Sequence, residues 1–320
     1  MDRQSSLRKV QSAVATFAAE HLPGVDRWCV ALSGGPDSLA LTAAAAGVSP
    51  TTALIIDHGL QQDSAAVADT ARRQALELGC VEAQVVSVTV GSVGGPEGAA
   101  RSARYGALEQ ARGTAPVLIG HTLDDQAETV LLGLARGSGP RSIAGIRPYD
   151  PPWGRPLLGL RRRDTEAACA ELGLVPWHDP HNADRRFTRA RLRAEVLPLL
   201  EEILNGGVAE ALARTATSLQ EDSDVLDELA VAAVDGARSG DGLAVAALAE
   251  LPDAIRRRVI RLWLLSSGAQ NLTAKHLRGV DALVADWHGQ GGVAVPAGLR
   301  EQRLFAGRHD GVLTLHREPV

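Results

Sequence analysis

Short apolar runs alternate with helical patterns through the first half of the chain. The predicted strands are Cys29–Leu32, Ala53–Asp57, Gln84–Thr89 and Val117–Gly120. The predicted helices that follow them are Asp37–Ala46, Ser64–Leu78, Gly98–Arg112 and Asp124–Ala135. Continuous apolar strands that alternate with helices are typical of a parallel sheet covered on both faces. We therefore predict an α/β fold with a doubly wound, mainly parallel sheet that binds its ligand at the carboxyl ends of the strands.

The 320 residues exceed what one hydrophobic core normally serves, so we predict two domains. The turn-forming run Asn205-Gly206-Gly207 marks the boundary, with an α/β domain over residues 1–205 and a smaller, mainly helical domain over residues 206–320. Helical periodicity covers Val208–Ala237, Pro252–Leu265 and Thr273–Trp287. A small terminal sheet with a hairpin turn at His309–Gly311 is predicted from the runs Val293–Val295, Leu299–Phe305 and Val312–Leu315.

Residues 136–184 are rich in Gly, Pro and Arg, and within them only Asp164–Leu172 has a clear helical pattern. This composition predicts a loop region beside the site. A further helix is predicted from Thr188 to Leu200, with an interruption at Pro198, because proline lacks the backbone donor that a helix interior needs.

The net charge of −5 argues against a protein that coats nucleic acid without specificity, although it allows a local basic face. Cys29, Cys80 and Cys169 lie far apart and form no C-x-x-C pair, so neither a disulfide framework nor a zinc site is expected. Unpaired thiols fit a reducing compartment. Residues 1–22 lack the unbroken apolar core of a signal peptide, and no run reaches the ~18 apolar residues of a membrane span. We expect a cytoplasmic protein with no membrane partner.

The first predicted strand runs directly into Ser33-Gly34-Gly35-Pro36-Asp37-Ser38. Gly34 and Gly35 lack Cβ atoms, so the backbone can turn tightly and bring N–H groups close to an anion. Pro36 suits the first helical position, and a helix start favours negative charge. The run differs from both G-x-x-x-x-G-K-S/T and G-x-G-x-x-G. It is compatible with an ordinary βα turn, but the motifs at neighbouring strand ends favour a phosphate-binding loop.

An acidic motif, His121-Thr122-Leu123-Asp124-Asp125-Gln126-Ala127-Glu128-Thr129, follows the fourth predicted strand. Thr122 suits an N-cap. Asp124, Asp125 and Glu128 are spaced by three and four residues, so their carboxylates share one helical face. The helix dipole alone also favours acids at this position. Three acids beside a phosphate loop exceed what the dipole requires, and they would hold Mg²⁺ or a cationic substrate.

His58 and the pair Arg101 and Arg104 each have two possible interpretations. His58, in Asp57-His58-Gly59-Leu60 after the second predicted strand, is either a partner for a loop carbonyl or a contact for adenosine. Arg101 and Arg104 share one helical face, either as solvated side chains or as a clamp on phosphates, which a guanidinium fork binds well.

Arginines are concentrated after His178-Asp179-Pro180-His181-Asn182. With Arg161-Arg162-Arg163 they predict a local positive patch on an acidic protein, formed by Arg185, Arg186, Arg189, Arg191 and Arg193. Such a patch suits contacts with the phosphate backbone of one particular RNA. A solvated charged face is the alternative.

The string SGGPDS resembles the pyrophosphatase loop of the N-type ATP pyrophosphatases, which cleave ATP between its α- and β-phosphates. In chain order, SGGPDS, DHGL, AARSARY, HTLDDQAET, RGSGPRSIAGI and HDPHNADRRFTRARLR together resemble the tRNA(Ile)-lysidine synthetase family. The resemblance spans roughly Cys29 to Leu200, and the helical part after Asn205 is similar to the short form of that enzyme.

This resemblance implies a Rossmann-like fold of the adenine nucleotide alpha-hydrolase type and a carbon–nitrogen ligase. With ATP and Mg²⁺, such a ligase joins L-lysine to C2 of the wobble cytidine of tRNA(Ile) with a CAU anticodon, through an adenylated intermediate. The products are lysidine, AMP and pyrophosphate, and decoding changes from AUG to AUA. The implied partners are tRNA(Ile) and L-lysine, and a homodimer is one option for the assembly.

The resemblance also assigns roles to residues of this sequence. The implied catalytic residues are Asp37, Asp124, Asp125, Glu128 and Arg104. The implied ATP-binding residues are Ala31, Ser33, Gly34, Gly35, Pro36, Asp37, Ser38, His58 and His121. Asp37 and Asp124 would hold Mg²⁺. From their shared helical face, we hypothesise that Asp125 and Glu128 bind and orient lysine. The implied tRNA-binding residues are Arg185, Arg189, Arg191 and Arg193.

Two other functions are compatible with the same loop. A tRNA sulfurtransferase would need a paired or activated cysteine, whereas Cys29 is expected in a buried strand and Cys169 in a peripheral helix. A non-catalytic RNA- or nucleotide-binding protein would gain nothing from the like charges of HTLDDQAET, which are costly to bury together.

Overall fold

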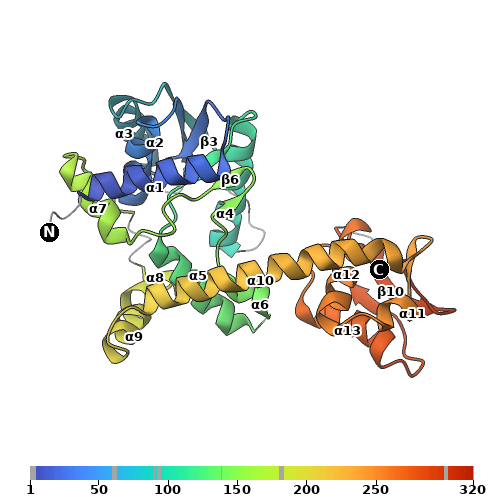
Figure 1. Cartoon of the computed structure of the whole chain (residues 1–320). Coiled ribbons are helices and arrows are strands. Elements are labelled where there is room, and N and C mark those ends of the chain that lie inside the picture. Colours follow the sequence, from blue (N-terminus) through green and yellow to red (C-terminus); the bar gives the residue numbers. More distant parts are fainter. Residues whose placement is uncertain are drawn as a thin grey trace. The chain divides into compact units, whose positions relative to one another are not determined.

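A computed structural model of the chain describes residues 5–59, 63–89, 91, 95–137, 139–179, 184–298 and 302–319 (Figure 1). The chain divides into two compact units. The first contains Met1–Leu131 and Gly145–Arg214, and the second contains Leu132–Ala144 and Thr215–Val320. The domain boundary predicted after residue 205 stays a prediction.

A six-stranded sheet forms the centre of the first unit, in the order β3-β2-β1-β4-β6-β5. Its strands are β1 (Trp28–Ala31), β2 (Thr51–Asp57), β3 (Glu82–Ser87), β4 (Val117–Ile119), β5 (Tyr149–Asp150) and β6 (Trp153–Gly154). All the described strand pairs are parallel except β5 with β6. Val30 lies opposite Ala53 of β2 and Leu118 of β4, so β1 lies between these two strands. The predicted mainly parallel sheet is confirmed.

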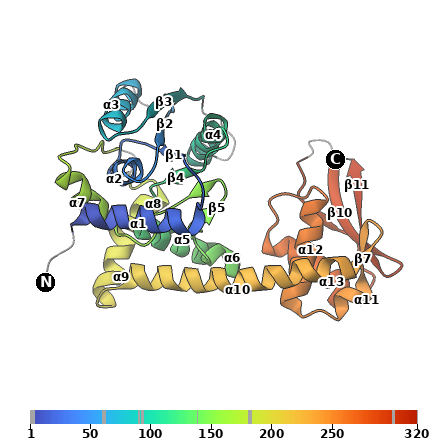
Figure 2. The same cartoon turned by 45° about the horizontal axis from the view of Figure 1, so that its top comes forward.

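Neighbouring residues of the central strands point to opposite faces of this sheet, and helices cover both. Val30 and Leu118 pack on one face with α1 (Ser6–His21), α2 (Pro36–Ala46), α3 (Ser64–Glu77) and α7 (Arg162–Glu171). Cys29 and Val117 pack on the other face with Leu108 of α4 (Gly95–Ala111). Figure 2 shows α2 and α4 on opposite sides of the strands. This packing confirms the doubly wound arrangement.

The chain between residues 136 and 204 differs from prediction at two places. In addition to α7, this part of the chain contains the short helix α6 (Pro140–Ile143) and the strands β5 and β6. These three elements are too short to show periodicity in the sequence. The predicted interruption at Pro198 is wrong. The chain stays helical through α8 (Thr188–Arg191), a π-helical turn (Leu192–Val196) and α9 (Leu197–Ile203). Pro198 lies in the first turn of α9, where the wide turn before it accommodates the proline ring and its missing N–H.

The second unit combines helices with a five-stranded sheet in the order β7-β8-β11-β10-β9. Its helices are α6, α11 (Val245–Ala249), α12 (Asp253–Ser266) and α13 (Ala274–Ala285), together with α10 (Val208–Ala237) from Thr215 on and α5 (Leu123–Arg136) from Leu132 on. The strands are β7 (Arg238–Ser239), β8 (Gly242–Ala244), β9 (Val293–Val295), β10 (Gln302–His309) and β11 (Val312–Pro319). Trp263 and Ile260 of α12 lie in its core.

The predicted hairpin turn between β10 and β11 is confirmed. Asp310 and Gly311 have φ angles of 47° and 76°, as a two-residue hairpin turn requires. The sequence did not predict β7 and β8, and the start of the predicted strand Leu299–Phe305 lies outside the described residues. In the part of the chain that the structure describes, no helix has the length and apolar character to cross a bilayer.

Candidate active site

The turn Ser33–Ser38 connects β1 to α2 at the carboxyl end of the sheet. Gly34 has a φ of 82°, a left-handed conformation that favours glycine. Its carbonyl accepts a hydrogen bond from the backbone N–H of Trp177 at 2.9 Å, which fixes the turn to a distant segment. The Ser38 hydroxyl donates to the Gly35 carbonyl at 2.9 Å. Because α2 begins directly in this turn, the turn presents a helix N-terminus, an arrangement that binds anionic groups.

The residue after β4 packs directly against the start of α2. A Cβ on Gly120 would lie 3.0 Å from the Asp37 carbonyl and 3.1 Å from the Ser38 nitrogen, so any larger residue would push the two backbone segments apart by a few tenths of an ångström. The acidic helix α5 (Leu123–Arg136) begins three residues later. The SGGPDS turn and the HTLDDQAET segment therefore lie side by side, as predicted.

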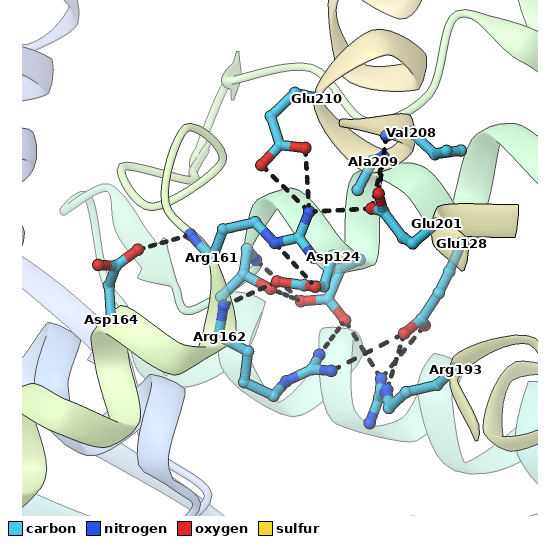
Figure 3. A network of polar contacts seen from close by, with 12 residues as sticks. Asp124, Glu128, Arg161, Arg162, Asp164, Arg193, Glu201, Val208, Ala209 and Glu210 are labelled. Atoms are coloured by element: carbon cyan, nitrogen blue, oxygen red, sulfur yellow. Dashed lines mark hydrogen bonds and ion pairs between the residues drawn. The ribbon is translucent and has the colours of Figure 1, made fainter. Parts of the chain in front are cut away.

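Arg162, the first residue of α7, joins the acids of both segments. Its Nε lies 3.2 Å from Asp37 Oδ2 and its Nη2 lies 3.0 Å from Asp125 Oδ1. Its Nη1 lies 3.8 Å from Glu128 Oε1. The backbone N–H of Arg162 also donates to Asp124 at 2.7 Å. Arg162 thus contacts all four carboxylates, Asp37, Asp124, Asp125 and Glu128, which we call the acid cluster. Figure 3 shows Asp124 and Glu128 of this cluster with Arg162.

Two further arginines border the acid cluster. Arg193 binds Glu128 with its Nε at 2.7 Å from Oε1 and its Nη2 at 3.2 Å from Oε2. Arg161 lies 3.3 Å from Asp124 and also pairs with Glu201 and Glu210. Figure 3 shows the guanidinium groups of Arg161, Arg162 and Arg193 arranged around the carboxylates.

Burial and pairing set different protonation tendencies within the acid cluster. Burial raises the pKa of Asp37, although Arg162 and a hydrogen bond from Thr165 oppose it. Burial likewise raises the pKa of Glu128 against the opposing effect of Arg193. Burial also acts to raise the pKa of Asp125, but Arg162 and the hydrogen bonds from Thr122 outweigh it, and that pKa is lowered. Glu128 is therefore a stronger base than Asp125.

A cavity of about 360 Å³ opens beside the acid cluster, and we call it the arginine cavity. It is lined by Arg101, His121, Thr129, Gly145, Ile146, Arg147, Asp150, Arg155 and Arg189. The buried Nδ1 of His121 has no hydrogen-bond partner among the described residues. Burial lowers the pKa of His121 to about 3, so its ring is neutral at neutral pH. A neutral ring among arginines suits a polar, anionic ligand.

Arg104 lies near both predicted nucleotide-contacting histidines. Burial lowers the pKa of His58, and the Arg104 guanidinium lowers it further, as it does for His121. The Arg104 guanidinium also lies 5.6 Å from the Tyr105 ring centroid, where Arg101 lies 4.9 Å away. Arg101 and Arg104 are therefore held beside an aromatic ring at the edge of the site.

The four predicted tRNA-binding arginines occupy different surroundings. Arg193 lies on Glu128, and Arg189 lines the arginine cavity and donates to Thr129 at 3.4 Å. Arg185 and Arg191 are exposed and pair with Glu195. Pro180, His181 and Asn182 of the adjoining motif, like Leu60 of DHGL and Ser138 of the glycine-rich motif, lie outside the described residues.

The role of Arg162 could not be predicted from the sequence. The run Arg161-Arg162-Arg163 was expected in a positive patch, but Arg161 and Arg162 pair with carboxylates and only Arg163 is exposed. Asp37 also contacts Thr165, which no motif singled out. The one available signal was that Arg162 lies two residues before the predicted helix Asp164–Leu172, and the sequence does not show which acids lie near the start of that helix.

The described residues contain no group of three or more His, Cys, Asp or Glu side chains arranged to hold a metal ion by themselves. Mg²⁺ is usually held by only one or two carboxylates, with phosphate oxygens and water completing its shell. Asp37 and Asp125 both direct a carboxylate oxygen at the same guanidinium. The oxygen donors of the acid cluster therefore fit Mg²⁺ when a nucleotide supplies the remaining ligands.

A doubly wound parallel sheet with SGGPDS at the carboxyl end of its central strand defines a PP-loop ATP-binding protein. The profile of the PP-loop domain matches residues 6–200, and that of the TilS substrate binding domain matches residues 243–311. The chain belongs to the tRNA(Ile)-lysidine synthase family. This confirms the fold class and the family resemblance of the sequence motifs.

Relatives cover the whole chain. The chain is 68% identical to a tRNA(Ile)-lysidine synthase of Mycolicibacterium paratuberculosis, with 100% of both chains covered. It is 66% identical to that of Mycobacterium tuberculosis, again over 100% of both chains. Among solved structures, the U34-tRNA thiolase NcsA from Methanococcus maripaludis has a TM-score of 0.55 at 18% identity, over 68% of this chain and 81% of that one. This last likeness shows the fold alone.

Proposed function

We propose that the chain joins L-lysine to C2 of the wobble cytidine of tRNA(Ile) with a CAU anticodon, at the expense of ATP. The family membership supports this reaction. The observation that carries it is the close packing of the SGGPDS turn against the acidic segment at Gly120. One surface then presents both an anion-binding turn and carboxylates for cations.

In the first step, cytidine O2 attacks the α-phosphorus of ATP and pyrophosphate leaves. Ala31, Ser33, Gly34, Gly35, Pro36 and Ser38 form the end of β1 and the turn that would hold the phosphates. His58 lies at the end of the neighbouring strand β2, where it would contact the adenosine. Mg²⁺ would be held by Asp37 and Asp124, and it would neutralise charge on the phosphates. Arg104 and Arg101 supply fixed positive charge at the edge of the site.

In the second step, the ε-amine of lysine attacks C2 and AMP leaves. An ammonium group is not a nucleophile, so a base must first take its proton. Glu128 suits this role because its pKa is raised, whereas the paired Asp125 suits a role in orienting the ammonium group. Both acids contact arginines, so lysine binding requires a rearrangement of these ion pairs.

The tRNA would be bound by Arg185, Arg189, Arg191 and Arg193. Of these, Arg189 lines the arginine cavity and Arg185 and Arg191 are exposed, so their charges are available to phosphates. The cytoplasmic location and a homodimeric assembly stay predictions.

The cysteines count against a sulfurtransferase. Cys29, Cys80 and Cys169 are buried and unpaired. Burial raises the pKa of both Cys80 and Cys169 to about 11, so these thiols stay protonated and weakly nucleophilic at neutral pH.

The test is incubation of the full chain with transcribed tRNA(Ile), ATP and labelled lysine. We expect ATP-dependent label in the RNA, and a wobble cytidine heavier by the mass of lysine less one water. A transcript whose wobble base is uridine is the control and should take up no label. Replacement of oxygen by sulfur without lysine, or pyrophosphate release with no RNA product, would contradict the proposal.

A further inference from the structure

The guanidinium of Arg162 lies among carboxylates from two segments of the candidate active site. Its side chain is only 18% exposed, and its guanidinium faces acids from two separate segments, Asp37 of α2 and Asp125 of α5. Glu128, whose side chain is fully buried, lies at 3.8 Å from the same group. Carboxylates this close destabilise one another unless a cation lies among them. Arg162 supplies that cation to Asp37 and Asp125, whereas Arg193 supplies one to Glu128.

The site of Arg162 is also the place where the proposed reaction needs other cations. Mg²⁺ binds carboxylate oxygens at about 2.1 Å, and a cationic group cannot share those oxygens at hydrogen-bond distance without repelling the ion. The Arg162 guanidinium, 3.2 Å from Asp37, would compete with Mg²⁺ for that carboxylate. At 3.0 Å from Asp125 and 3.8 Å from Glu128, it would also compete with a substrate ammonium for these two acids.

The local structure allows the side chain of Arg162 to leave without unfolding its helix. Arg162 is the first residue of α7, and its backbone N–H is held separately by Asp124 at 2.7 Å. Thr165, one turn further along α7, keeps its own hydrogen bond to Asp37. These backbone and hydroxyl contacts would hold α7 in place while the guanidinium moves.

We propose that Arg162 is an internal counter-cation: it neutralises the acid cluster in the free protein and gives way when a divalent cation or the substrate ammonium binds. The identity of those displacing cations rests on the proposed function. The exchange itself depends only on the contacts of Arg162, so it is testable with a metal ion alone. Arg162 is on this view a positioning residue, which acts through Asp37 and Asp125.

The test is titration of the nucleotide-free full chain with Mn²⁺, followed by electron paramagnetic resonance of the free ion. We expect Arg162→Gln to bind Mn²⁺ about tenfold more tightly or better, because one positive charge a few ångströms from the bound ion is removed. Arg163→Gln, the exposed neighbour, should bind like the unmodified chain. In Arg162→Gln combined with Asp37→Asn, the gain should disappear. An affinity for Arg162→Gln within twofold of the unmodified chain would overturn the proposal.

A second measurement separates this role from a merely structural one. In EDTA, Arg162→Gln should melt at a lower temperature than the unmodified chain, and Mn²⁺ should restore most of the loss. Arg162→Lys keeps one charge but cannot contact Asp37 and Asp125 at once, so its Mn²⁺ affinity should be intermediate. A melting temperature that Mn²⁺ does not restore would show that Arg162 serves only the packing of α7. Because neither measurement involves tRNA or lysine, their failure is distinct from failure of the ligase activity.

Discussion

Each unit of the molecule contains an arginine among carboxylates, buried in the second unit and largely buried in the first, and the two arrangements differ in their balance of charge. In the second unit, Arg256 donates to Asp281 at 2.6 Å, to Asp253 at 2.8 Å and to the Leu251 carbonyl at 3.2 Å. Arg257 adds a second positive charge at 3.5 Å from Asp281. Two arginines thus meet two acids, and each guanidinium nitrogen of Arg256 has a partner.

The acid cluster of the first unit is not balanced in this way. Its four carboxylates face Arg162 and Arg193, while Arg161 is divided between Asp124 and two further acids, Glu201 and Glu210. Acids therefore outnumber arginines, and the pKa of Asp37 stays raised despite Arg162. Equal numbers of arginines and acids stabilise one conformation. An excess of largely buried carboxylates instead favours the binding of a further cation, which a substrate or a metal ion can supply. The balance of charge, rather than its burial, thus distinguishes the structural ion pairs of Arg256 from the acid cluster.

The largest effect is expected from Asp37→Asn. The lost carboxylate would lower lysidine formation about 10³-fold, in line with removal of one electrostatic group from a catalytic site. The same change should raise the melting temperature slightly, because the raised pKa of Asp37 means that its charge is unfavourable in the fold. Activity assays and thermal melts of Asp37→Asn and of the exposed control Asp69→Asn provide the check. An Asp37→Asn variant that is both inactive and clearly less stable would show that Asp37 stabilises the fold, as Asp281 does.

The matching change in the second unit is Asp281→Asn. It leaves the buried Arg256 without its main partner, so we expect a loss of about 3 kcal/mol in the free energy of unfolding. Urea denaturation measures this loss. Asp235→Asn is the control, since its pair with Arg238 is exposed and should contribute less than about 1 kcal/mol. Equal effects of the two variants would mean that the second-unit pair is not structural.

These two regions also show how far the sequence could predict the structure. The strand–turn–helix around Gly34 and the spacing of Asp124, Asp125 and Glu128 are local features, so the fold class and the position of the site followed from them. Arg162 could not be predicted as a partner of Asp37, because the two are 125 residues apart and only the packing of α7 against α2 brings them together. The π-helical turn before Pro198 likewise depends on tertiary packing, since local propensity favours a break.

Glu128→Gln tests the division of labour within the acid cluster. We expect lysine transfer to fall about 10²-fold, because the amide cannot accept the ammonium proton. Exchange of labelled pyrophosphate into ATP, which depends on tRNA but not on lysine, should persist. Glu202→Gln, exposed on α9, is the matched control. Loss of both reactions together would contradict separate roles for Asp37 and Glu128.

The smallest effect is expected from the pH dependence of stability through His121. Its pKa is lowered to about 3 in the fold, so below about pH 6.5 the unfolded chain takes up a proton that the folded chain does not. The contribution of the neutral His121 ring to the free energy of unfolding is therefore fully present above pH 6.5, and it is lost progressively as the pH falls toward 3. Between pH 7 and pH 5 this loss amounts to about 2 kcal/mol.

Urea denaturation of His121→Gln at both pH values measures that contribution. The variant should lose about 2 kcal/mol less than the unmodified chain between pH 7 and pH 5. His309→Gln, exposed in the hairpin of the second unit, should follow the unmodified chain because its ring is in contact with water in both states. If His121→Gln and His309→Gln lose stability equally with acid, the His121 ring is hydrated in the folded protein. The arginine cavity would then be an open surface and not the partly enclosed anion-binding site that the buried Nδ1 indicates.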